Sequence, residues 1–535
     1  PKIFFPVTTS SYTKSWDLDG TYKGIQLVKQ DILNVDEYGN LLMKEVLHDE
    51  YKTTPDGTEW NWQTQYWTFY NHVTDNGKWH SRLASTTVKA KSYELNNQWK
   101  FESTENEYYN NGLLMSTKSI AGYNQFNSPL VKKENFEYDI YGNIKKKTLS
   151  APNNAQLASR ITEFEYGSIY ESRLLTMQKI KGTSGSSSDD CTVYEYYPDK
   201  GLLKEKKELY NISTSTSPVV THYEYDLFGR LLKTINPDQT MSFTETTFAG
   251  TAGGQVPSGA ILKVKKYTKT LSNQEWGVSI SFFDRQGNKL RSVAQNLSGT
   301  YIYADKVYDE YNRLVNAKEP YFAGTSTNLA TTYTYDVLGR VLTVTSPDGS
   351  LTRTTYKGRS VKTKNMTSMV WTEKVVNAIG LLDLVIDTLG SLDASAIINN
   401  NYDGLGRQIS TVAFYNTTSF EYDAAGNQSK LIDPNAGTSI YTYNAFGELL
   451  TQQDARGNTY QMTYDCLGRI QTKSLSSGGN DVTTYTYNNT AGTNGFGQLQ
   501  SVARSNGTSQ AFAYDNLGRI LSKTETIDGN SFTFA

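Results

Sequence analysis

The residues most often used in catalysis or metal binding are scarce in this sequence. Its 535 residues include only four histidines and two cysteines. None of the histidines lies in an HxxxH or HExxH spacing or in a triad-like context. Cys191 and Cys466 are far apart, and neither belongs to a CxxC pair or another metal-ligand spacing. The sequence therefore predicts free thiols, no cofactor, no metal site and no enzymatic activity within this segment. The four histidines are His48, His72, His80 and His222.

Five arginines recur at the same position of a short repeated sequence. They are Arg230, Arg340, Arg407, Arg469 and Arg519. A row of arginines could form a ligand-binding ladder. An arginine at an exposed edge, however, more often pairs with a nearby carboxylate. We therefore interpret these arginines as partners of carboxylates in the turns that contain them.

The arginines belong to a short sequence that is repeated along most of the chain. Clear copies read YDLFGRLL from Tyr225, YDVLGRVL from Tyr335 and YNAFGELL from Tyr443, and each places a glycine four residues after the tyrosine. We predict that the tyrosine, aspartate and glycine form the structural motif of the repeat. In six copies these residues are Tyr225, Asp226, Gly229, Tyr335, Asp336, Gly339, Tyr402, Asp403, Gly406, Tyr422, Asp423, Gly426, Tyr464, Asp465, Gly468, Tyr514, Asp515 and Gly518.

One copy departs from this pattern in an informative way. In YDEYNRLV, which starts at Tyr308, Asn312 replaces the glycine. Asparagine tolerates a left-handed backbone better than most residues, so this position is predicted to have a positive φ within a turn. The aspartate after the tyrosine can accept hydrogen bonds from amides of that turn. The YDxxG sequence is therefore predicted to form a turn, which we call the YD turn.

A second turn follows about eleven residues after the tyrosine, as in Ser346-Pro347-Asp348-Gly349. About six residues with strand character separate the two turns, so one unit is a pair of strands with two turns. Tyrosines two residues apart, such as Tyr333 and Tyr335, would lie on one face of the sheet, with Thr334 on the other. Stacked units would align these tyrosines in cross-strand ladders.

Composition and unit length together predict an all-β fold. The 39 tyrosines favour strands and the 41 glycines favour turns. Because an isolated hairpin is marginal in water, the units must pair in one continuous antiparallel sheet that winds or curls. Residues 1–105 hold six of the eight tryptophans. They are predicted to be a degenerate start of the same sheet, which continues through residues 106–535.

Charge and hydropathy argue against a nucleic-acid-binding protein and against a membrane-spanning one. A formal net charge of −2 with 20% charged residues offers no basic face for nucleic acid. No apolar run is long enough to span a membrane, and residues 379–389, the nearest candidate, are predicted to be a buried strand pair.

The chain starts without methionine and stops within an apparent strand, Ser531–Ala535, so we expect a piece of a longer polypeptide.

The pattern YDxxGRLxxxxxPDG, seen from Tyr335 to Gly349, resembles the Rhs or YD-repeat family. This family includes bacterial polymorphic toxins, Tc toxin B and C components and, more distantly, animal teneurins. The resemblance covers about residues 30–535, and the opening IFFPVTTSSYTKSW is similar to the segment before the Rhs part of Tc toxin B components. It implies that the sheet spirals into a hollow, cocoon-like shell around a C-terminal toxin domain. The family's self-cleavage motif has no match here.

These observations lead to a main hypothesis and two alternatives. The main hypothesis is a non-enzymatic shell segment of a secreted or cell-surface bacterial protein, which encapsulates a toxin polypeptide for delivery. Its partners would be the toxin cargo or the complementary part of the shell, together with a translocation or secretion component. The first alternative is an extracellular adhesion or ligand-binding module. The second is a glycan-binding surface that uses tryptophans of the first hundred residues, such as Trp60 and Trp62.

Overall fold

The computed structural model describes most of the chain. The described residues are 10–18, 22–29, 36, 40–54, 57–73, 82–92, 99–121, 130–168, 172–181, 189–210, 219–251, 254–269, 274–388, 395–476, 481–489 and 493–535. Within them every regular element is a β-strand, 41 in all, so the predicted all-β class is confirmed. The same residues contain no helix that could cross a membrane.

The strands follow one another closely, because each repeat contributes two strands and two short turns. The first fourteen are β1 (Ser10–Trp16), β2 (Tyr22–Lys29), β3 (Met43–Thr54), β4 (Gly57–His72), β5 (Leu83–Ser92), β6 (Lys100–Tyr108), β7 (Leu114–Ala121), β8 (Lys132–Tyr138), β9 (Ile144–Ser150), β10 (Arg160–Tyr166), β11 (Leu175–Ile180), β12 (Asp190–Tyr196), β13 (Leu203–Tyr210) and β14 (Val219–Tyr225).

The middle of the chain continues in the same way. Its strands are β15 (Leu231–Ile235), β16 (Met241–Phe248), β17 (Leu262–Lys269), β18 (Glu275–Phe283), β19 (Lys289–Gln295), β20 (Tyr301–Tyr308), β21 (Leu314–Lys318), β22 (Tyr321–Phe322), β23 (Ala330–Tyr335), β24 (Val341–Thr345), β25 (Leu351–Lys357), β26 (Ser360–Asn365), β27 (Trp371–Val376) and β28 (Leu382–Thr388).

The last strands hold the most regular repeats. They are β29 (Ser395–Tyr402), β30 (Gln408–Ala413), β31 (Asn416–Tyr422), β32 (Gln428–Asp433), β33 (Gly437–Tyr443), β34 (Leu449–Gln453), β35 (Thr459–Tyr464), β36 (Ile470–Leu475), β37 (Val482–Tyr487), β38 (Leu499–Arg504), β39 (Ser509–Tyr514), β40 (Ile520–Ile527) and β41 (Asn530–Phe534).

Pairing between these strands is antiparallel and almost entirely sequential. Each strand pairs with the next, as β1 does with β2 and β40 with β41; the short β22 is the exception, because it pairs with β20 while β21 pairs with β23. Connections therefore lie alternately at the two ends of the strands, and they form two rows of turns along the sheet. We call the row that contains the YD turns the YD edge and the other row the opposite edge; neither name refers to an edge strand.

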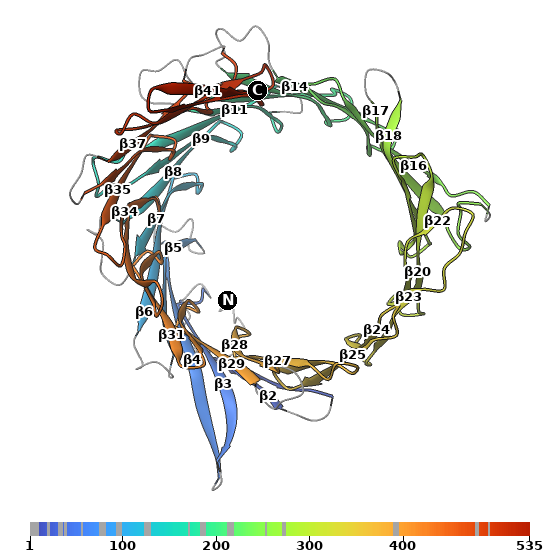
Figure 1. Ribbon diagram of the computed structural model, residues 1–535. Helices are drawn as coiled ribbons and strands as arrows, with labels where there is room; N and C mark the ends of the chain where they lie inside the picture. The colour runs from blue at the N-terminus through green and yellow to red at the C-terminus, as the bar shows by residue number, and fades with distance from the viewer. Residues whose placement is uncertain are drawn as a thin grey trace, which may run out of the picture.

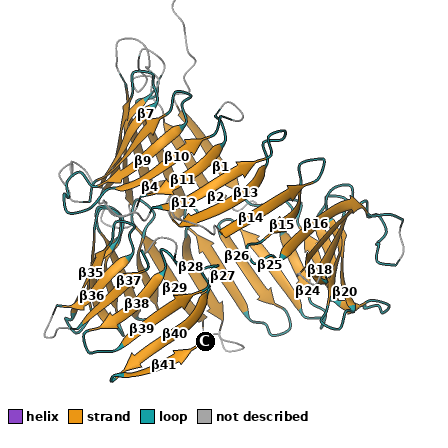
Figure 2. Cartoon of the chain, turned by 90° about the horizontal axis from the view of Figure 1, so that it is seen from above, coloured by secondary structure: helices purple, strands orange, loops and turns teal. Residues whose placement is uncertain are grey.

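The sheet winds into an open spiral around a wide interior. Figure 1 shows the chain running from β3 and β4 past β9 and β14, down through β20 and β24, and back alongside the first strands at β31 to β41, which lie nearer the viewer. Seen from above, the strands of the last part lie in a second tier beside those of the first (Figure 2). The predicted spiralling sheet is thus confirmed, with more than one turn of the spiral present.

The exposed area fits a wall one sheet thick. The chain exposes 31313 Å², whereas a compact protein of 60.0 kDa would expose about 19,000 Å². A cluster of buried apolar side chains lies on β16 to β20, where Phe282 and Val293 are almost fully covered. Since most of the sheet has no second layer on either face, both of its faces are available to solvent or to other molecules.

Two expectations about local structure have different outcomes. In β23 the side chains of Tyr333 and Tyr335 are half-buried and that of Thr334 is exposed, so the predicted alternation of faces is confirmed. The predicted strand pair at residues 379–389 is wrong. Residues 377–381 form a turn, closed by the Asn377 amide donating to the Leu381 carbonyl, and a single strand follows it. The Asn377–Gly380 pair makes this run a degenerate YD turn.

Candidate functional site

The YD turn at Asp336–Arg340 shows how the repeat is built. The Asp336 amide donates to the Arg340 carbonyl at 2.9 Å, and the Gly339 amide donates to the Asp336 carbonyl at 3.0 Å. Asp336 Oδ1 accepts the amides of Leu338 and Arg340, both at 2.9 Å. The register of the hairpin shifts by one residue at Tyr335, as a bulge requires. One carboxylate therefore organises the whole turn.

The same turn recurs at the other copies of the motif. The described motif glycines have φ between 75° and 88°, the left-handed region in which glycine is least strained. Asn312 has φ 61°, so the positive φ predicted from its substitution for glycine is confirmed. The glycine values are 77° at Gly229, 79° at Gly339, 80° at Gly406, 88° at Gly426, 83° at Gly468 and 75° at Gly518.

The motif tyrosine joins one hairpin to the previous one. Tyr335 donates its hydroxyl hydrogen to the Leu314 carbonyl at 2.6 Å, and Leu314 follows the preceding YD turn. The same bond recurs in six further copies: Tyr138 to Leu114, Tyr308 to Lys289, Tyr402 to Leu382, Tyr422 to Gln408, Tyr464 to Leu449 and Tyr514 to Leu499. The hydroxyl thus gives a partner to a backbone carbonyl that lies before the ladder with the next strand, since the register of β21 with β23 begins at Asn316.

The repeated arginines are held by the turn aspartates, as the sequence suggested. Arg340 Nε donates to Asp336 Oδ2 at 2.6 Å, and equivalent pairs join Arg230, Arg407, Arg469 and Arg519 to their own aspartates. Several of these guanidinium groups also cover the tyrosine of the next unit. Tyrosines are in ring contact across strands at Tyr303 and Tyr321, whereas at Tyr356 the neighbour on the ring is Arg340, 4.2 Å from the centroid.

These contacts change the acidity of the groups involved. Burial alone would raise the pKa of Asp336, but the hydrogen bonds from the backbone and side chain of Arg340 hold that pKa below its ordinary value. Burial raises the pKa of Tyr335, which keeps the hydroxyl protonated as a donor. Both shifts favour the protonation states that the turn requires at neutral pH.

Successive turns of the spiral meet along a seam, which we define as the contact between late YD turns and the opposite edge of early strands. At its beginning, Arg340 Nη2 donates to Asp17 Oδ1, just after β1, at 2.8 Å. Further along, Gly404 lies against β5 so closely that a Cβ at this position would be 2.5 Å from the Cα of Lys91. Only glycine fits between these two backbones.

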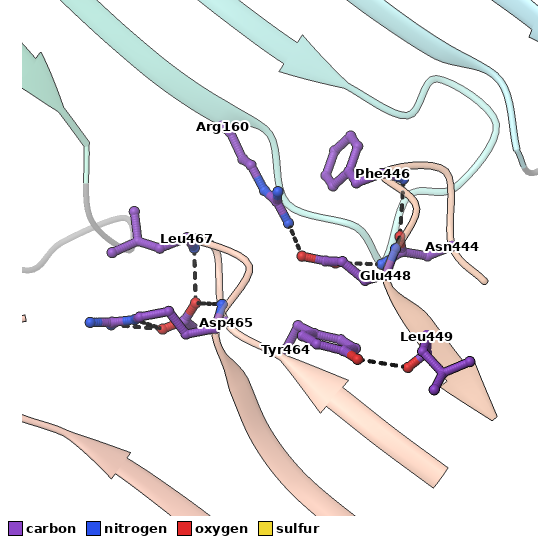
Figure 3. Close-up of polar contacts among 9 residues, drawn as sticks. Arg160, Asn444, Phe446, Glu448, Leu449, Tyr464, Asp465 and Leu467 are labelled. Carbon is purple, nitrogen blue, oxygen red and sulfur yellow. Dashed lines mark hydrogen bonds and ion pairs between the residues drawn. The ribbon is translucent and has the colours of Figure 1, made fainter. Parts of the chain in front are cut away.

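The centre of the seam is formed by Arg160 at the start of β10. Its guanidinium forms an ion pair with Glu448 and lies 4.4 Å from the ring centroid of Phe446, both in the YD turn before β34 (Figure 3). This turn carries Asn444 where the six copies named above have aspartate, and Glu448 where five of them have arginine. Asn444 Oδ1 still accepts the amides of Phe446 and Glu448, so the turn keeps its shape while the reversed charge faces Arg160.

Of the residues first considered for catalysis, those whose side chains the structure describes are not gathered into a common site. His222 Nδ1 lies 3.1 Å from Glu205 Oε1 across β13 and β14, and His72 ends β4. Burial raises the pKa of the Cys191 thiol to about 11, and Cys466 lies in a YD turn of the seam. The side chain of His48 and all of His80 fall outside the described residues. Within those residues no group of three His, Cys, Asp or Glu is placed to hold a metal ion.

Two of the early tryptophans are in contact with lysines. Lys89 Nζ lies 4.2 Å from the ring centroid of Trp99 and 5.0 Å from that of Trp67. These aromatic faces are therefore engaged by the protein's own cation. The side chains of Trp60 and Trp62 lie outside the described part of the chain, so the glycan hypothesis for them stays a prediction.

Sequence reasoning missed the tyrosine hydroxyl bonds and the whole seam. Two signals were present in the repeat itself. Gly404 occupies a variable position that carries a side chain in the other strong copies, and Glu448 occupies the position of arginine. Each departure from the pattern coincides with a contact to the neighbouring turn of the spiral.

Comparisons with known proteins agree with this geometry. A family model described as RHS Repeat matches residues 308–351. No curated protein sequence matches the chain. Among solved structures, the chain resembles the crystal structure of TcdB2-TccC3 with a TM-score of 0.58 and 11% identity, over 98% of this chain and 37% of that one.

Two related structures give similar values. TcdB2-TccC3 without its hypervariable C-terminal region has a TM-score of 0.58 and 12% identity, over 98% of this chain and 38% of that one. A Tc holotoxin pore from Photorhabdus luminescens with a TccC3 mutation has a TM-score of 0.60 and 12% identity, with the same coverage. At these identities the likeness establishes the fold, and the chain spans less than two fifths of each of these three matched chains.

Proposed function

Since this chain belongs to the Rhs/YD-repeat family, we propose that it is a non-enzymatic wall segment of a hollow shell that encloses a toxin polypeptide. The wall would protect its cargo during secretion by a bacterium and release it at a target cell. Residues 1–105 would lead into the wall, and residues 106–535 would form its repeats. The matched structures are complexes of two named components, TcdB2 and TccC3, so the second component is the model for a partner that completes the shell or supplies the cargo.

The observation that carries this proposal is the single-layered sheet wound around an open interior (Figure 1). A sheet that packed against a second layer would bury one face. Here the large exposed area leaves both faces accessible, and one of them lines the interior. An unfolded or partly folded polypeptide can contact such a surface along its whole length.

Site-specific photo-crosslinking to a polypeptide fused after Ala535 tests the proposal. The crosslinker is placed at neighbouring residues whose side chains lie on opposite faces, namely Tyr333 or Thr334, and Tyr441 or Thr442. Enclosure predicts that the fused polypeptide crosslinks to the same face at both places. Equal crosslinking to both faces, or none to either, would contradict it.

A matched control separates enclosure from loose contact. Crosslinking should persist when the fusion is diluted, because an enclosed segment is held in the same molecule. Adding the same polypeptide as a separate chain should give little product. If the separate chain crosslinks as well as the fused one, the wall binds polypeptides without enclosing them.

A further inference from the structure

Loops and side chains alone hold the second turn of the spiral against the first. Within the described residues no strand ladder joins one of β1–β14 to one of β23–β41, and no backbone hydrogen bond crosses the seam. Strands within one turn, in contrast, share a ladder several residues long, as β35 and β36 do from Tyr460 to Tyr464. The seam can therefore open without breaking any ladder of the wall.

Open grooves separate the contacts along the seam. A groove of about 310 Å³ is lined by Ala445 and Ser119, and one of about 500 Å³ is lined by Cys466 and Asp190. A packed protein interior, in contrast, has few voids larger than a water molecule. The seam is therefore a row of separate contacts and not a continuous packed interface.

Arg160 lies against two successive YD turns. It pairs with Glu448 and covers the Phe446 ring in the first of them (Figure 3). In the second, a Cβ on Gly468 would be 3.0 Å from Arg160 Nη1. Phe228 occupies the position of Phe446 in another copy of the motif and is 83% exposed, so the burial of Phe446 comes from the seam and not from its own turn. One side chain thus holds both YD turns against the first turn of the spiral.

Holding Arg160 in the seam has an energetic cost. Within the described residues its Nε is buried and makes no hydrogen bond. A buried donor without an acceptor has lost its hydration without compensation, and opening of the seam returns it to water. The ion pair with Glu448 also loses hydration on closing, so its net contribution is smaller than its Coulomb attraction. Closure of the seam is therefore expected to be weaker than the pairing of strands within the sheet.

We infer that the wall opens along the seam while its strand ladders stay intact, and that Arg160 is the latch that keeps the seam closed. Opening moves the YD turns at 444–448 and 465–469 away from β10 and leaves a slot between the two turns of the spiral. Local opening of this kind is typical of regions with few packed contacts. The opening rests on the contacts of the wall alone, whereas its use as a lateral exit for an enclosed polypeptide rests on the proposed function.

The two cysteines of the chain report on the seam and on the sheet separately. Cys466 lines the larger seam groove, whereas Cys191 is fully buried in β12. Labelling of the 535-residue chain with a maleimide, followed by mass spectrometry of its peptides, gives a rate for each thiol. Arg160→Glu is expected to raise the labelling rate of Cys466 about tenfold or more, because like charges then face each other in the seam. The rate of Cys191 should not change.

The direct effect of the lost charge on the thiol has the opposite sign. Burial raises the pKa of the Cys466 thiol, and the positive charge of Arg160 acts against this rise. Without that charge less thiolate is present, and the thiolate is the form that reacts. The charge effect alone would therefore slow the labelling of Cys466 in Arg160→Glu, so faster labelling reports opening of the seam.

Two further variants complete the labelling experiment. Arg160→Glu combined with Glu448→Arg should restore slow labelling of Cys466, because opposite charges face each other again. Lys430→Glu reverses one charge of an ion pair within a single hairpin and should change neither rate. The latch would be overturned if Arg160→Glu left the rate of Cys466 unchanged. It would also be overturned if the rates of Cys466 and Cys191 rose together, since the sheet would then open with the seam.

The exit is tested on the chain that carries a polypeptide fused after Ala535. Protease should cleave the fused polypeptide faster in Arg160→Glu than in the wild-type chain, while the wall itself stays intact. Unchanged cleavage despite faster labelling of Cys466 would overturn the exit. Failure of the face-selective crosslinking described above would remove the enclosure proposal and leave the measured opening of the seam unaffected.

Discussion

Arg160 and Glu448 form an ion pair although 288 residues separate them in the chain. Arg160 begins β10 on the opposite edge of the first turn of the spiral, and Glu448 ends a YD turn of the second. The separation of the two residues in the chain is therefore the length of chain that makes one turn of the spiral at this point. The ion pair is also partly shielded from solvent, since the side chain of Glu448 is only 12% exposed. Together with the Phe446 ring it fixes the seam at this point.

Reversing the charge of either partner should open the seam locally. Glu448→Arg or Arg160→Glu places like charges together in a half-buried contact, and each is expected to lower the free energy of unfolding by about 1–3 kcal/mol. The double variant Arg160→Glu with Glu448→Arg should recover most of this loss. Chemical denaturation of the four proteins measures the coupling.

The control for this cycle is an exposed pair within one hairpin. Lys430 and Glu421 form an ion pair at 3.0 Å on the wall surface, and Lys430→Glu should cost less than about 1 kcal/mol. Additive effects of the two seam substitutions would show that the pair does not couple the turns of the spiral.

Gly404→Ala should destabilise the seam by overpacking. The added Cβ would lie 2.5 Å from Lys91 Cα and 2.7 Å from the Ala90 carbonyl carbon, and neither backbone atom can move without shifting β5. We expect a loss of about 1–3 kcal/mol in the free energy of unfolding. Leu227→Ala changes the same motif position on the exposed edge, and a change within about 0.5 kcal/mol is expected there. Equal effects would mean that the close approach is not maintained in solution.

Removing the motif tyrosine hydroxyls should loosen neighbouring hairpins from one another. Tyr335→Phe leaves the Leu314 carbonyl without its partner, at an expected cost of about 0.5–1.5 kcal/mol. Tyr464→Phe should behave in the same way at Leu449, and the two effects should add because the sites are far apart. Thermal or chemical unfolding followed by circular dichroism measures both.

The matched control uses a tyrosine on the same strand and face. Within the described residues the Tyr333 hydroxyl makes no hydrogen bond, so Tyr333→Phe should leave the unfolding midpoint nearly unchanged. A loss as large as that of Tyr335→Phe would assign the effect to ring packing and not to the hydroxyl.

Acid should weaken the wall through its turn aspartates. In Asp226, Asp336 and Asp515 hydrogen bonds from the turn outweigh any effect of burial, so the pKa in the folded state lies below the ordinary value near 4. A lowered pKa gives stability that is complete above the unfolded pKa and is lost as pH falls toward the folded pKa. The thermal midpoint is therefore expected to be constant from neutral pH to about pH 5 and to fall below about pH 4.

Replacing these aspartates by asparagine tests whether their carboxylates cause the loss of stability in acid. Asn444 shows that an asparagine can accept the same two amides, so Asp226→Asn and Asp336→Asn should preserve the turn. Both variants should make the acid dependence shallower. An acid dependence that is unchanged in the double variant would place its origin outside the YD turns.

The hairpin was predictable from sequence because its causes are local. The aspartate, the glycine and the two following strands are close neighbours in the chain, and Asn312 at the glycine position revealed a positive φ without any structure. The tyrosine pair revealed the half-buried face for the same reason. The hydroxyl bond from Tyr335 to Leu314 was not predictable, because it depends on how one hairpin lies against the previous one.

By itself the sequence determined the all-β class, the YD turn, the alternation of the two faces and the family resemblance. Only the tertiary structure decided which YD turns meet an earlier strand and which remain exposed. That choice depends on the twist accumulated over many strands and on the lengths of the insertions between repeats, neither of which a single motif encodes. The same two residues, Phe228 and Phe446, are therefore alike in sequence and different in environment, because only one of them has a turn of the wall beside it.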